Sequence, residues 1–292
     1  MIESITRIVP ATFYVVKGKT KTEPLLIYRT AQELDMINII KKVEQEASKT
    51  KVDELLGEYS DIFEGIGKMK GVKVDLNIDD KIEPTAQPCR RIPFSVRPKL
   101  EEEFTSLEKE DIIERIDKPT SWVSPTVITP KKNPNEIRLN VDMRVANNAI
   151  PRVNSITPTI DELIHKLNGA VVFSHLDMNH GYHQIELDEH SRDVTTFSTH
   201  TGFFRYKRLN YGTKSAGDIF QNKVREELTQ HIPGCVNISD DILVYGRSRQ
   251  EHDQYLQSLF ETAREKEVTF NKSKCEFNKD KCLYYGLVFS KE

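Results

Sequence analysis

Hydrophobic and polar residues follow two patterns along this chain, one with helical spacing and one with strand spacing. Residues 98–116 (PKLEEEFTSLEKEDIIERI) place Leu100, Phe104, Leu107 and Ile112 on one side of an amphipathic helix. Helical spacing returns in three later segments, so that helices are also predicted over residues 157–170, 215–232 and 248–267.

Two of these helices carry a recognisable start signal. Thr159 with Glu162, and Ser248 with Glu251, have the spacing of a capping box, in which the two side chains bond the free N–H groups of the first turn. Gly169 can end the first of the two helices, since glycine readily adopts the backbone conformation found just beyond a helix.

Short stretches of β-branched and aromatic residues predict strands between the helices. Together they give an α+β fold, in which a mostly antiparallel sheet has helices on one face. Palm-like sheets of nucleotide polymerases have this shape, and so do many ferredoxin-like domains. The predicted strands and hairpins lie at residues 121–132, 137–144, 171–178, 195–209, 235–246, 268–272, 274–278 and 282–290.

The part of the chain before these signals is organised differently. Residues 1–40 alternate apolar residues and predict a small β-rich piece, whereas residues 41–95 are polar and then extended, which predicts a connector. Residues 96–292 carry the strong helix and strand signals and form the main domain.

Composition removes several classes of protein. With 292 residues, 37% of them hydrophobic, the chain can bury a sizeable core, and it has no apolar run of membrane-spanning length and no signal peptide, so we expect an intracellular protein. The four cysteines lack zinc-finger spacing. A net charge of −3 disfavours a surface that binds phosphate everywhere, although local basic patches remain.

An adjacent pair of acids, Asp240 and Asp241, interrupts the strand-like sequence NISDDILVYG. Aspartates are common in hairpin turns, so the pair alone can be explained without any chemistry. A third acid changes this interpretation, because Asp177 ends the predicted strand VVFSHLD with Gly181 close behind it. If the hairpin pairs beside that strand, Asp177 and Asp240 lie on one side and can share metal ions.

Three gathered carboxylates suit phosphoryl chemistry. Joining a nucleotide to a strand is an in-line displacement assisted by two metal ions about 3.5–4 Å apart. Mg²⁺ fits such a site, because it takes a few carboxylates and completes its octahedron with phosphate oxygens and water. Hydrolases and phosphatases use the same grouping, so an unrelated two-metal phosphotransferase on a ferredoxin-like fold remains an alternative.

Four segments of the chain, taken in their order and spacing, favour one family of proteins. They are LDMNHGYHQIEL, FSTHTGFFRYKRLNYGTKSAGDIFQ, NISDDILVYG and KCEFNKDKCLYYGLVFS. From about Glu54 to its end the chain resembles the reverse transcriptase of gypsy-like LTR retrotransposons and retroviruses. The resemblance implies the fingers and palm of a right-hand polymerase over residues 96–292, lacking the thumb, and a remnant of a retropepsin C-terminal segment over residues 1–40.

The resemblance also implies an activity. It is RNA-directed DNA polymerisation, with two Mg²⁺ ions (or Mn²⁺) as cofactors and with deoxynucleoside triphosphates and an RNA or DNA template-primer as partners. We expect no protease activity, because no Asp-Thr-Gly or Asp-Ser-Gly triplet is present. The expected location is the cytoplasm or virus-like particles, and the sequence leaves the oligomeric state open.

Residue roles follow from the same resemblance. Asp177 and Asp240 would be the principal metal ligands, assisted by the Met178 carbonyl, with Asp241 as a weaker ligand. The remaining roles are triphosphate binding by Lys131 and Arg138, exclusion of a ribose 2′-hydroxyl by Tyr182, a nucleotide pocket at Tyr211 and Gly212, and a primer grip at Tyr284, Tyr285 and Gly286.

Other positions depart from the family pattern. Ile238 replaces a common aromatic residue, Leu287 a common histidine, and Asn210, Thr213 and Gly217 are unusual in the nucleotide pocket. A decayed or co-opted fragment that only binds nucleic acid or a protein partner is therefore the alternative function.

Overall fold

The computed structural model describes residues 2–3, 8–9, 51–130, 137–155 and 157–290. The chain divides into two compact units, residues 1–56 and 57–292. In the first unit, β1 (Ile2–Glu3) pairs with β2 (Ile8–Val9) in antiparallel fashion. Most of the predicted retropepsin remnant, residues 1–40, lies outside the described residues, so the predicted domain boundaries stay a prediction.

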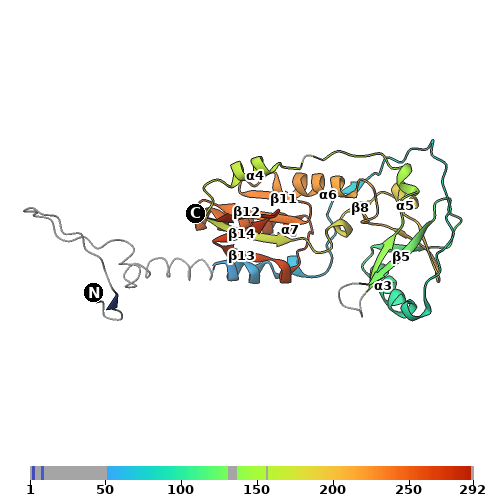
Figure 1. Ribbon diagram of the computed structural model, residues 1–292, viewed down its shortest axis with the longest axis horizontal. Helices are drawn as coiled ribbons and strands as arrows, with labels where there is room; N and C mark the ends of the chain where they lie inside the picture. The colour runs from blue at the N-terminus through green and yellow to red at the C-terminus, as the bar shows by residue number, and fades with distance from the viewer. Residues whose placement is uncertain (1, 4–7, 10–50, 131–136, 156, 291–292) are drawn as a thin grey trace, which may run out of the picture. The chain divides into compact units, whose positions relative to one another are not determined.

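The second unit contains a four-stranded antiparallel sheet (Figure 1). Its strand order is β11-β12-β7-β13, so the two central strands come from distant parts of the chain. The predicted strand at residues 171–178 and the predicted hairpin at residues 235–246 are confirmed, and they are neighbours. The strands are β7 (Val172–Asp177), β11 (Cys235–Ile238), β12 (Asp241–Gly246) and β13 (Glu276–Lys279).

Helices α6 (Ala216–Val224) and α7 (Arg249–Glu265) cover one face of this sheet. The other face is covered by α4 (Ile160–Leu167) and the hairpin of β14 (Lys281–Tyr284) and β15 (Leu287–Ser290), which the sequence did not place there. Leu163 and Leu167 of α4 pack with Phe173, Leu243 and Tyr284 in one buried cluster.

A second, five-stranded sheet lies in the region for which the family resemblance implies fingers. Its order is β4-β10-β9-β5-β6, with a single parallel pair between β5 and β9. Helix α3 (Arg97–Lys109) packs on it by stacking Phe104 on Phe204, with the ring centroids 5.0 Å apart. The strands are β4 (Ile113–Ile116), β5 (Ser124–Pro130), β6 (Ile137–Val141), β9 (Phe197–Thr199) and β10 (Gly202–Tyr206).

Short elements connect the two sheets. The predicted connector is helical over residues 51–58 and in η1 (Ser60–Phe63), and its strand β3 (Lys73–Val74) pairs in parallel with β8 (Glu186–Leu187). The others are the 3₁₀ helices η2 (Phe94–Val96), η3 (Ala146–Asn148), η4 (Gly181–Gln184) and η6 (Lys272–Lys274), and α5 (Glu189–Asp193).

The capping boxes and element bounds predicted from the sequence are confirmed at some positions and wrong at others. The capping box of Thr159 and Glu162 forms as predicted. At α7, Ser248 caps the helix, but Glu251 accepts from the N–H of Arg247 rather than from that of Ser248. The helix predicted over residues 215–232 changes to a π-helix, η5 (Arg225–Thr229), and the strand predicted over residues 268–272 is only a bridge from Phe270 to Met178.

Candidate active site

The hairpin between β11 and β12 positions two of the three acids. Ile238 pairs with Asp241, so the two-residue turn consists of Ser239 and Asp240. The interpretation that both aspartates form the turn is therefore wrong, because Asp241 is already the first residue of β12. Ser239 adopts a positive φ of 55°, a left-handed conformation that the tight turn requires.

The third acid lies directly opposite this hairpin. Asp177, the last residue of β7, is the antiparallel partner of Asp241, and directly opposed residues on neighbouring strands point to the same face. The N–H of Met178 donates to the Asp240 carbonyl at 3.0 Å, which ties the turn to the end of β7. The three acids thus meet at one corner of the sheet, on the face away from α6 and α7.

Gln221 of α6 holds the turn from behind. Its side-chain oxygen accepts from the N–H of Ser239 at 2.6 Å, and its side-chain nitrogen donates to the Asn237 carbonyl at 3.1 Å. Thr229 of the π-helix donates to the Asn237 side chain at 2.8 Å. These buried groups satisfy one another, so the turn is fixed to the helix layer.

Asp177 interacts with Lys274. The Lys274 ammonium donates to Oδ1 of Asp177 at 3.0 Å and to Oδ2 at 3.1 Å. The pKa of Asp177 is nevertheless raised from its usual range, first because burial disfavours the charged form, and also because Asp240 and Asp241 repel it. The repulsion by Asp240 and Asp241 is consistent with the sheet register, which brings the three carboxylates close together.

Asp241 faces different partners. Its Oδ1 lies 2.8 Å from Nε2 of His175, two residues before Asp177 on the same face of β7. Their hydrogen bond raises the pKa of His175, because it stabilises the imidazolium. The buried Tyr284 hydroxyl donates to the Asp241 carbonyl at 3.1 Å, so Tyr284 supports the strand that carries the acid.

Within the described residues, no group of three or more His, Cys, Asp and Glu side chains is gathered as a metal-binding cluster. Asp177 and Asp241 are instead bonded to Lys274 and His175. The donor chemistry still fits a divalent ion, because carboxylate and carbonyl oxygens are the ligands that Mg²⁺ prefers. The ammonium of Lys274 shows in addition that a cation can sit against both oxygens of Asp177.

An aromatic pocket adjoins the acids. The half-buried Tyr182 ring stacks on Phe220 with centroids 4.7 Å apart and leans against Tyr211 at 4.6 Å. The pKa of Tyr211 is raised to about 12, because neighbouring atoms desolvate its hydroxyl and because Asp240, Tyr182 and Asp177 disfavour a phenolate. Tyr211 is therefore a protonated hydroxyl at neutral pH, even though 57% of the residue remains exposed.

Gly212 follows at a point where no side chain fits. A Cβ there would lie 2.8 Å from Cγ of Met143 and 3.0 Å from the Val141 carbonyl. Arg138 of β6 is exposed, and its positive charge acts on the hydroxyl of Tyr211 from the fingers side. Lys131, the other predicted triphosphate ligand, lies outside the described residues.

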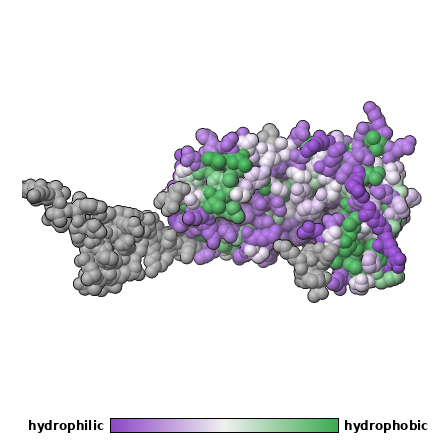
Figure 2. All heavy atoms as spheres, viewed as in Figure 1, coloured by the Kyte–Doolittle hydropathy of each residue, from purple (hydrophilic) through white to green (hydrophobic). Residues whose placement is uncertain are grey.

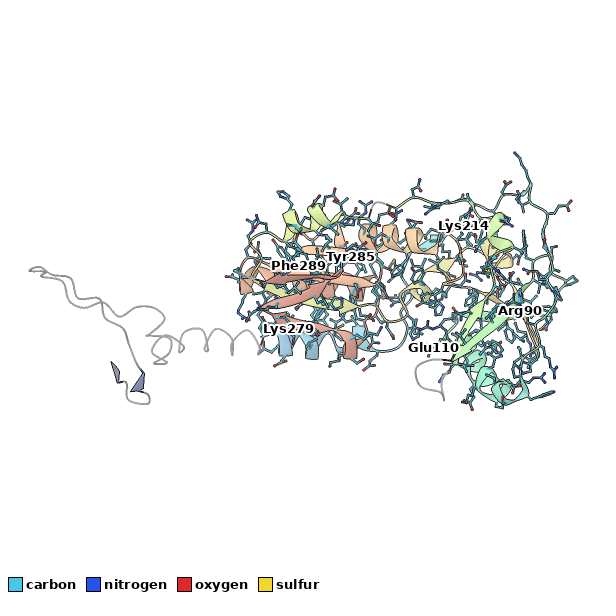
Figure 3. All side chains as sticks on the ribbon, in the orientation of Figure 1. Arg90, Glu110, Lys214, Lys279, Tyr285 and Phe289 are labelled. Atoms are coloured by element: carbon cyan, nitrogen blue, oxygen red, sulfur yellow. The ribbon has the colours of Figure 1, made fainter. Side chains whose placement is uncertain are left out.

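The predicted primer grip forms a hairpin turn. Tyr285 and Gly286 adopt φ values of 50° and 78° and join β14 to β15. Tyr285 is 55% exposed, unlike the buried Tyr284. Figure 3 labels Tyr285 and Phe289 of this hairpin beside the four-stranded sheet. Figure 2 shows hydrophobic surface at the end of the unit that carries α4 and this hairpin, where Ile160, Ile164, Leu283 and Val288 are exposed.

The departures from the family pattern are accommodated. The Thr213 hydroxyl donates to the side-chain oxygen of buried Asn210 at 2.5 Å, so these two polar residues satisfy each other. A Cβ at Gly217 would lie 3.5 Å from the Tyr182 hydroxyl, which is an ordinary contact distance. Because glycine has no Cβ, the space beside that hydroxyl stays open. The unusual residues thus do not displace the acids or the aromatic pocket.

Three contacts of the site were not predicted from the sequence. They join Lys274 to Asp177, His175 to Asp241, and Gln221 to the turn at Ser239. His175 could have been found, because it stands two residues before Asp177 and strand periodicity puts both on one face. Nothing in the sequence pairs Lys274 with Asp177, since 96 residues separate them. A Ser174–His252–Asp253 series of contacts (2.8 and 3.0 Å) resembles a hydrolytic triad, but Ser174 of β7 and both α7 residues are buried between the sheet and the helix, away from any substrate.

An antiparallel sheet with acids at a hairpin corner, an aromatic pocket beside them and two helices behind defines a polymerase-type palm. The family model described as reverse transcriptase (RNA-dependent DNA polymerase) matches residues 129–289, more than half of the chain. The chain belongs to this reverse transcriptase family.

Curated relatives are much longer than this chain. The retrovirus-related Pol polyprotein from transposon 412 of Drosophila melanogaster is 31% identical over 282 residues, which cover 91% of this chain and 23% of that protein. The corresponding polyprotein from transposon gypsy of the same species is 30% identical over 65% of this chain and 19% of its own length. The chain thus spans about a fifth of the length of such relatives.

Solved structures show the same fold. The foamy viral protease-reverse transcriptase in complex with double-stranded DNA superposes with a TM-score of 0.75 at 18% identity, over 84% of this chain and 43% of that one. The complex of a foamy viral protease-reverse transcriptase with an RNA/DNA hybrid gives a TM-score of 0.74 at 20% identity, over 84% and 33% of the two chains. None of the helices in the described part of the chain is long and apolar enough to span a membrane.

Proposed function

We propose that this chain is the fingers and palm part of an RNA-directed DNA polymerase, which adds deoxynucleotides to a primer 3′-hydroxyl. The observation that carries the proposal is the register of the palm sheet, which sets Asp241 opposite Asp177 with Asp240 in the adjoining turn. An RNA or DNA template-primer is the proposed partner, and the nucleic acid complexes of the structural neighbours support it.

Reverse transcriptases use divalent metal ions. In this chain Asp177 and Asp240 would be the main ligands of two Mg²⁺ or Mn²⁺ ions, with the Met178 carbonyl and Asp241 as further oxygen donors. Such ions activate the attacking oxygen and stabilise the leaving one. The hydrogen bonds to Gln221 keep the Ser239–Asp240 turn in a single position, so that the acids are arranged before substrate binds.

The nucleotide would lie between the acids and the fingers. Arg138 offers a planar guanidinium that can bind two phosphate oxygens at once, and Lys131 would add a second charge. Tyr211 supplies a hydroxyl donor, and Gly212 beside it lets the backbone of the pocket pack closely against Met143 and the Val141 carbonyl. The Tyr182 ring, fixed by Phe220, would close the sugar side and exclude a 2′-hydroxyl.

The hairpin tip would contact the primer. Tyr285 and Gly286 form its exposed turn, and Tyr284 anchors the tip to the Asp241 strand by its hydrogen bond. The primer end and the acids are thus held by one connected piece of structure. The proposed location is the cytoplasm or virus-like particles, as the resemblance to retrotransposon polymerases implies.

Primer extension on poly(rA)/oligo(dT) with Mg²⁺ or Mn²⁺ tests the proposal. We expect the wild-type chain to extend the primer and Asp240→Asn to lose at least about 100-fold in rate, because it removes a charged ligand from the reacting centre. Asp80→Asn is the matched control, since Asp80 is exposed and lines a pocket with Glu114 and Arg205 of the five-stranded sheet, and it should extend at the wild-type rate.

Extension that survives Asp240→Asn would remove Asp240 from the catalytic site. No extension by any variant, together with retained template-primer binding in a filter assay, would favour the alternative of a binding module. The two results differ in the wild-type lane, so the assay separates a wrong residue assignment from a wrong function.

A further inference from the structure

Lys274 is in contact with both oxygens of the Asp177 carboxylate. It belongs to η6, and its ammonium lies 3.0 and 3.1 Å from the two oxygens of Asp177. The Asp177 side chain is only 13% exposed, whereas that of Lys274 is 59% exposed. The carboxylate is therefore fixed within the protein, and its partner reaches in from the solvent side.

The backbone of η6 is fixed next to the same strand end. The N–H of Asn271 donates to the Asp177 carbonyl at 2.8 Å, and the N–H of Lys274 donates to the Asn271 carbonyl at 3.0 Å. The Asn271 side chain also caps the N–H of Ser273 at 3.2 Å. Because the backbone is held while the long lysine side chain is half exposed, the ammonium can leave Asp177 by rotation of the side chain alone.

We propose that Lys274 is a resident counter-ion, which occupies Asp177 when no metal is bound and must be displaced when a divalent ion binds. This inference rests on the proposed function, because it assumes that Asp177 is a metal ligand. Its consequence is that Lys274 weakens divalent metal binding while it stabilises the metal-free site. The site would then fill most readily when a metal arrives with triphosphate, whose charge can receive the freed ammonium.

The physical basis is competition for one pair of oxygens. A carboxylate buried among other acids is costly to keep charged, so a neighbouring ammonium stabilises it. A divalent ion bound to the same two oxygens would lie next to the ammonium, and the repulsion between the two cations disfavours binding of both at once. The pair is half exposed, so its own strength, and with it the penalty on metal binding, should be modest.

Lys272 provides a matched control. It lies in the same η6 turn and carries the same charge, but its ammonium is directed over the Phe63 ring, 5.8 Å from the centroid. Lys272→Met therefore removes one positive charge two residues away without freeing the oxygens of Asp177. A general electrostatic effect would appear in both variants, whereas direct competition would appear only in Lys274→Met.

The test is Mn²⁺ binding to the metal-free full-length chain, followed by electron paramagnetic resonance of free Mn²⁺. We expect Lys274→Met to bind Mn²⁺ about fivefold more tightly than wild type, the factor at the upper end of the range for loss of a competing, partly exposed ion pair. Lys274→Arg, which keeps the charge, and Lys272→Met should stay within about twofold. In the absence of metal, Lys274→Met should melt at a lower temperature.

A second readout uses the unmutated chain. Mass-spectrometric mapping of amine labelling should show that Lys274 reacts faster in saturating Mg²⁺ than without metal, while Lys272 does not change. Equal or weaker Mn²⁺ binding by Lys274→Met, or Lys274 labelling that stays constant with Mg²⁺, would overturn the counter-ion role.

Asp177→Asn separates this inference from the proposed function. If wild type binds Mn²⁺, Asp177→Asn does not, and Lys274→Met binds no more tightly, the metal site stands and only the role of Lys274 fails. If wild type, Asp177→Asn and Lys274→Met all bind equally or not at all, the metal site at Asp177 fails, and the counter-ion role fails with it.

Discussion

At the scale of single residues, the position of Tyr182 is set by its ring contacts. Phe220 stacks on it almost in parallel, with an interplanar angle of 13°, and Tyr211 leans on it at 41°. Gly181 beside it cannot carry a side chain, because a Cβ there would lie 2.6 Å from the Phe220 ring. The Tyr182 ring is therefore a rigid wall rather than a mobile surface side chain.

This rigidity leads to a prediction on sugar selection. Tyr182→Val should lower the preference for deoxynucleotides over ribonucleotides by about 10- to 100-fold, because a smaller side chain leaves room for the 2′-hydroxyl. The measurement is kcat/KM for dTTP and UTP in primer extension. Tyr182→Phe is the control, since it keeps the ring and should keep the preference. An unchanged preference in the Val variant would show that Tyr182 does not face the sugar.

Single residues also differ in how far the sequence predicts their place in the site. The acids stood out because charges rarely occur within strand-like sequence, and Asp177 and the hairpin do meet. Lys274 gave no such signal, because its partner lies far away in sequence and one lysine among 42 basic residues carries no pattern. Contacts between distant positions depend on tertiary packing, which periodicity does not encode.

At the scale of elements, the hairpin of β11 and β12 depends on α6. Gln221 bonds the turn at Ser239 and the strand at Asn237, and it is only 4% exposed. The sequence predicted both the helix and the hairpin, but not this link between them, because a glutamine within a helix is usually a surface residue. The π-helix that follows places Thr229 within reach of Asn237 and completes the link.

Removal of this link should affect both stability and turnover. Gln221→Leu should lower the free energy of unfolding by about 1–3 kcal/mol, because it leaves buried hydrogen-bonding groups of Ser239 and Asn237 unsatisfied. Because the Asp240 turn is then less firmly held, kcat should fall more than KM for dTTP rises. Urea unfolding and steady-state extension measure the two effects.

The matched control is Gln257→Leu in α7, where the partly exposed glutamine donates to Glu261 within its own helix. This variant should change stability by less than about 0.5 kcal/mol and leave kcat unchanged. If Gln221→Leu were as stable and as active as this control, Gln221 would not organise the turn.

At the scale of the whole molecule, the sequence predicted the α+β class but not the full layering. Strand periodicity and helix caps identified most elements between residues 97 and 290. The placement of α4 and the β14–β15 hairpin on the second face depended on which side each element packs, and a short strand such as β14 carries little information about that. The sequence did not predict the strand order of the sheet, β11-β12-β7-β13, and raised only one of its pairings, that of the hairpin beside the Asp177 strand, as a condition.

The division of the chain at Leu56–Gly57 gives the last prediction. Every site residue and both large sheets belong to the second unit. A fragment of residues 51–292, which keeps the whole helical turn at residues 51–58, should therefore unfold in one cooperative transition within about 4 °C of the full-length chain. It should also retain primer extension. Calorimetry and the extension assay, with the full-length chain as control, provide the measurements. A broad, non-cooperative transition of the fragment would show that the first 50 residues contribute to the core of the palm, contrary to the two-unit division.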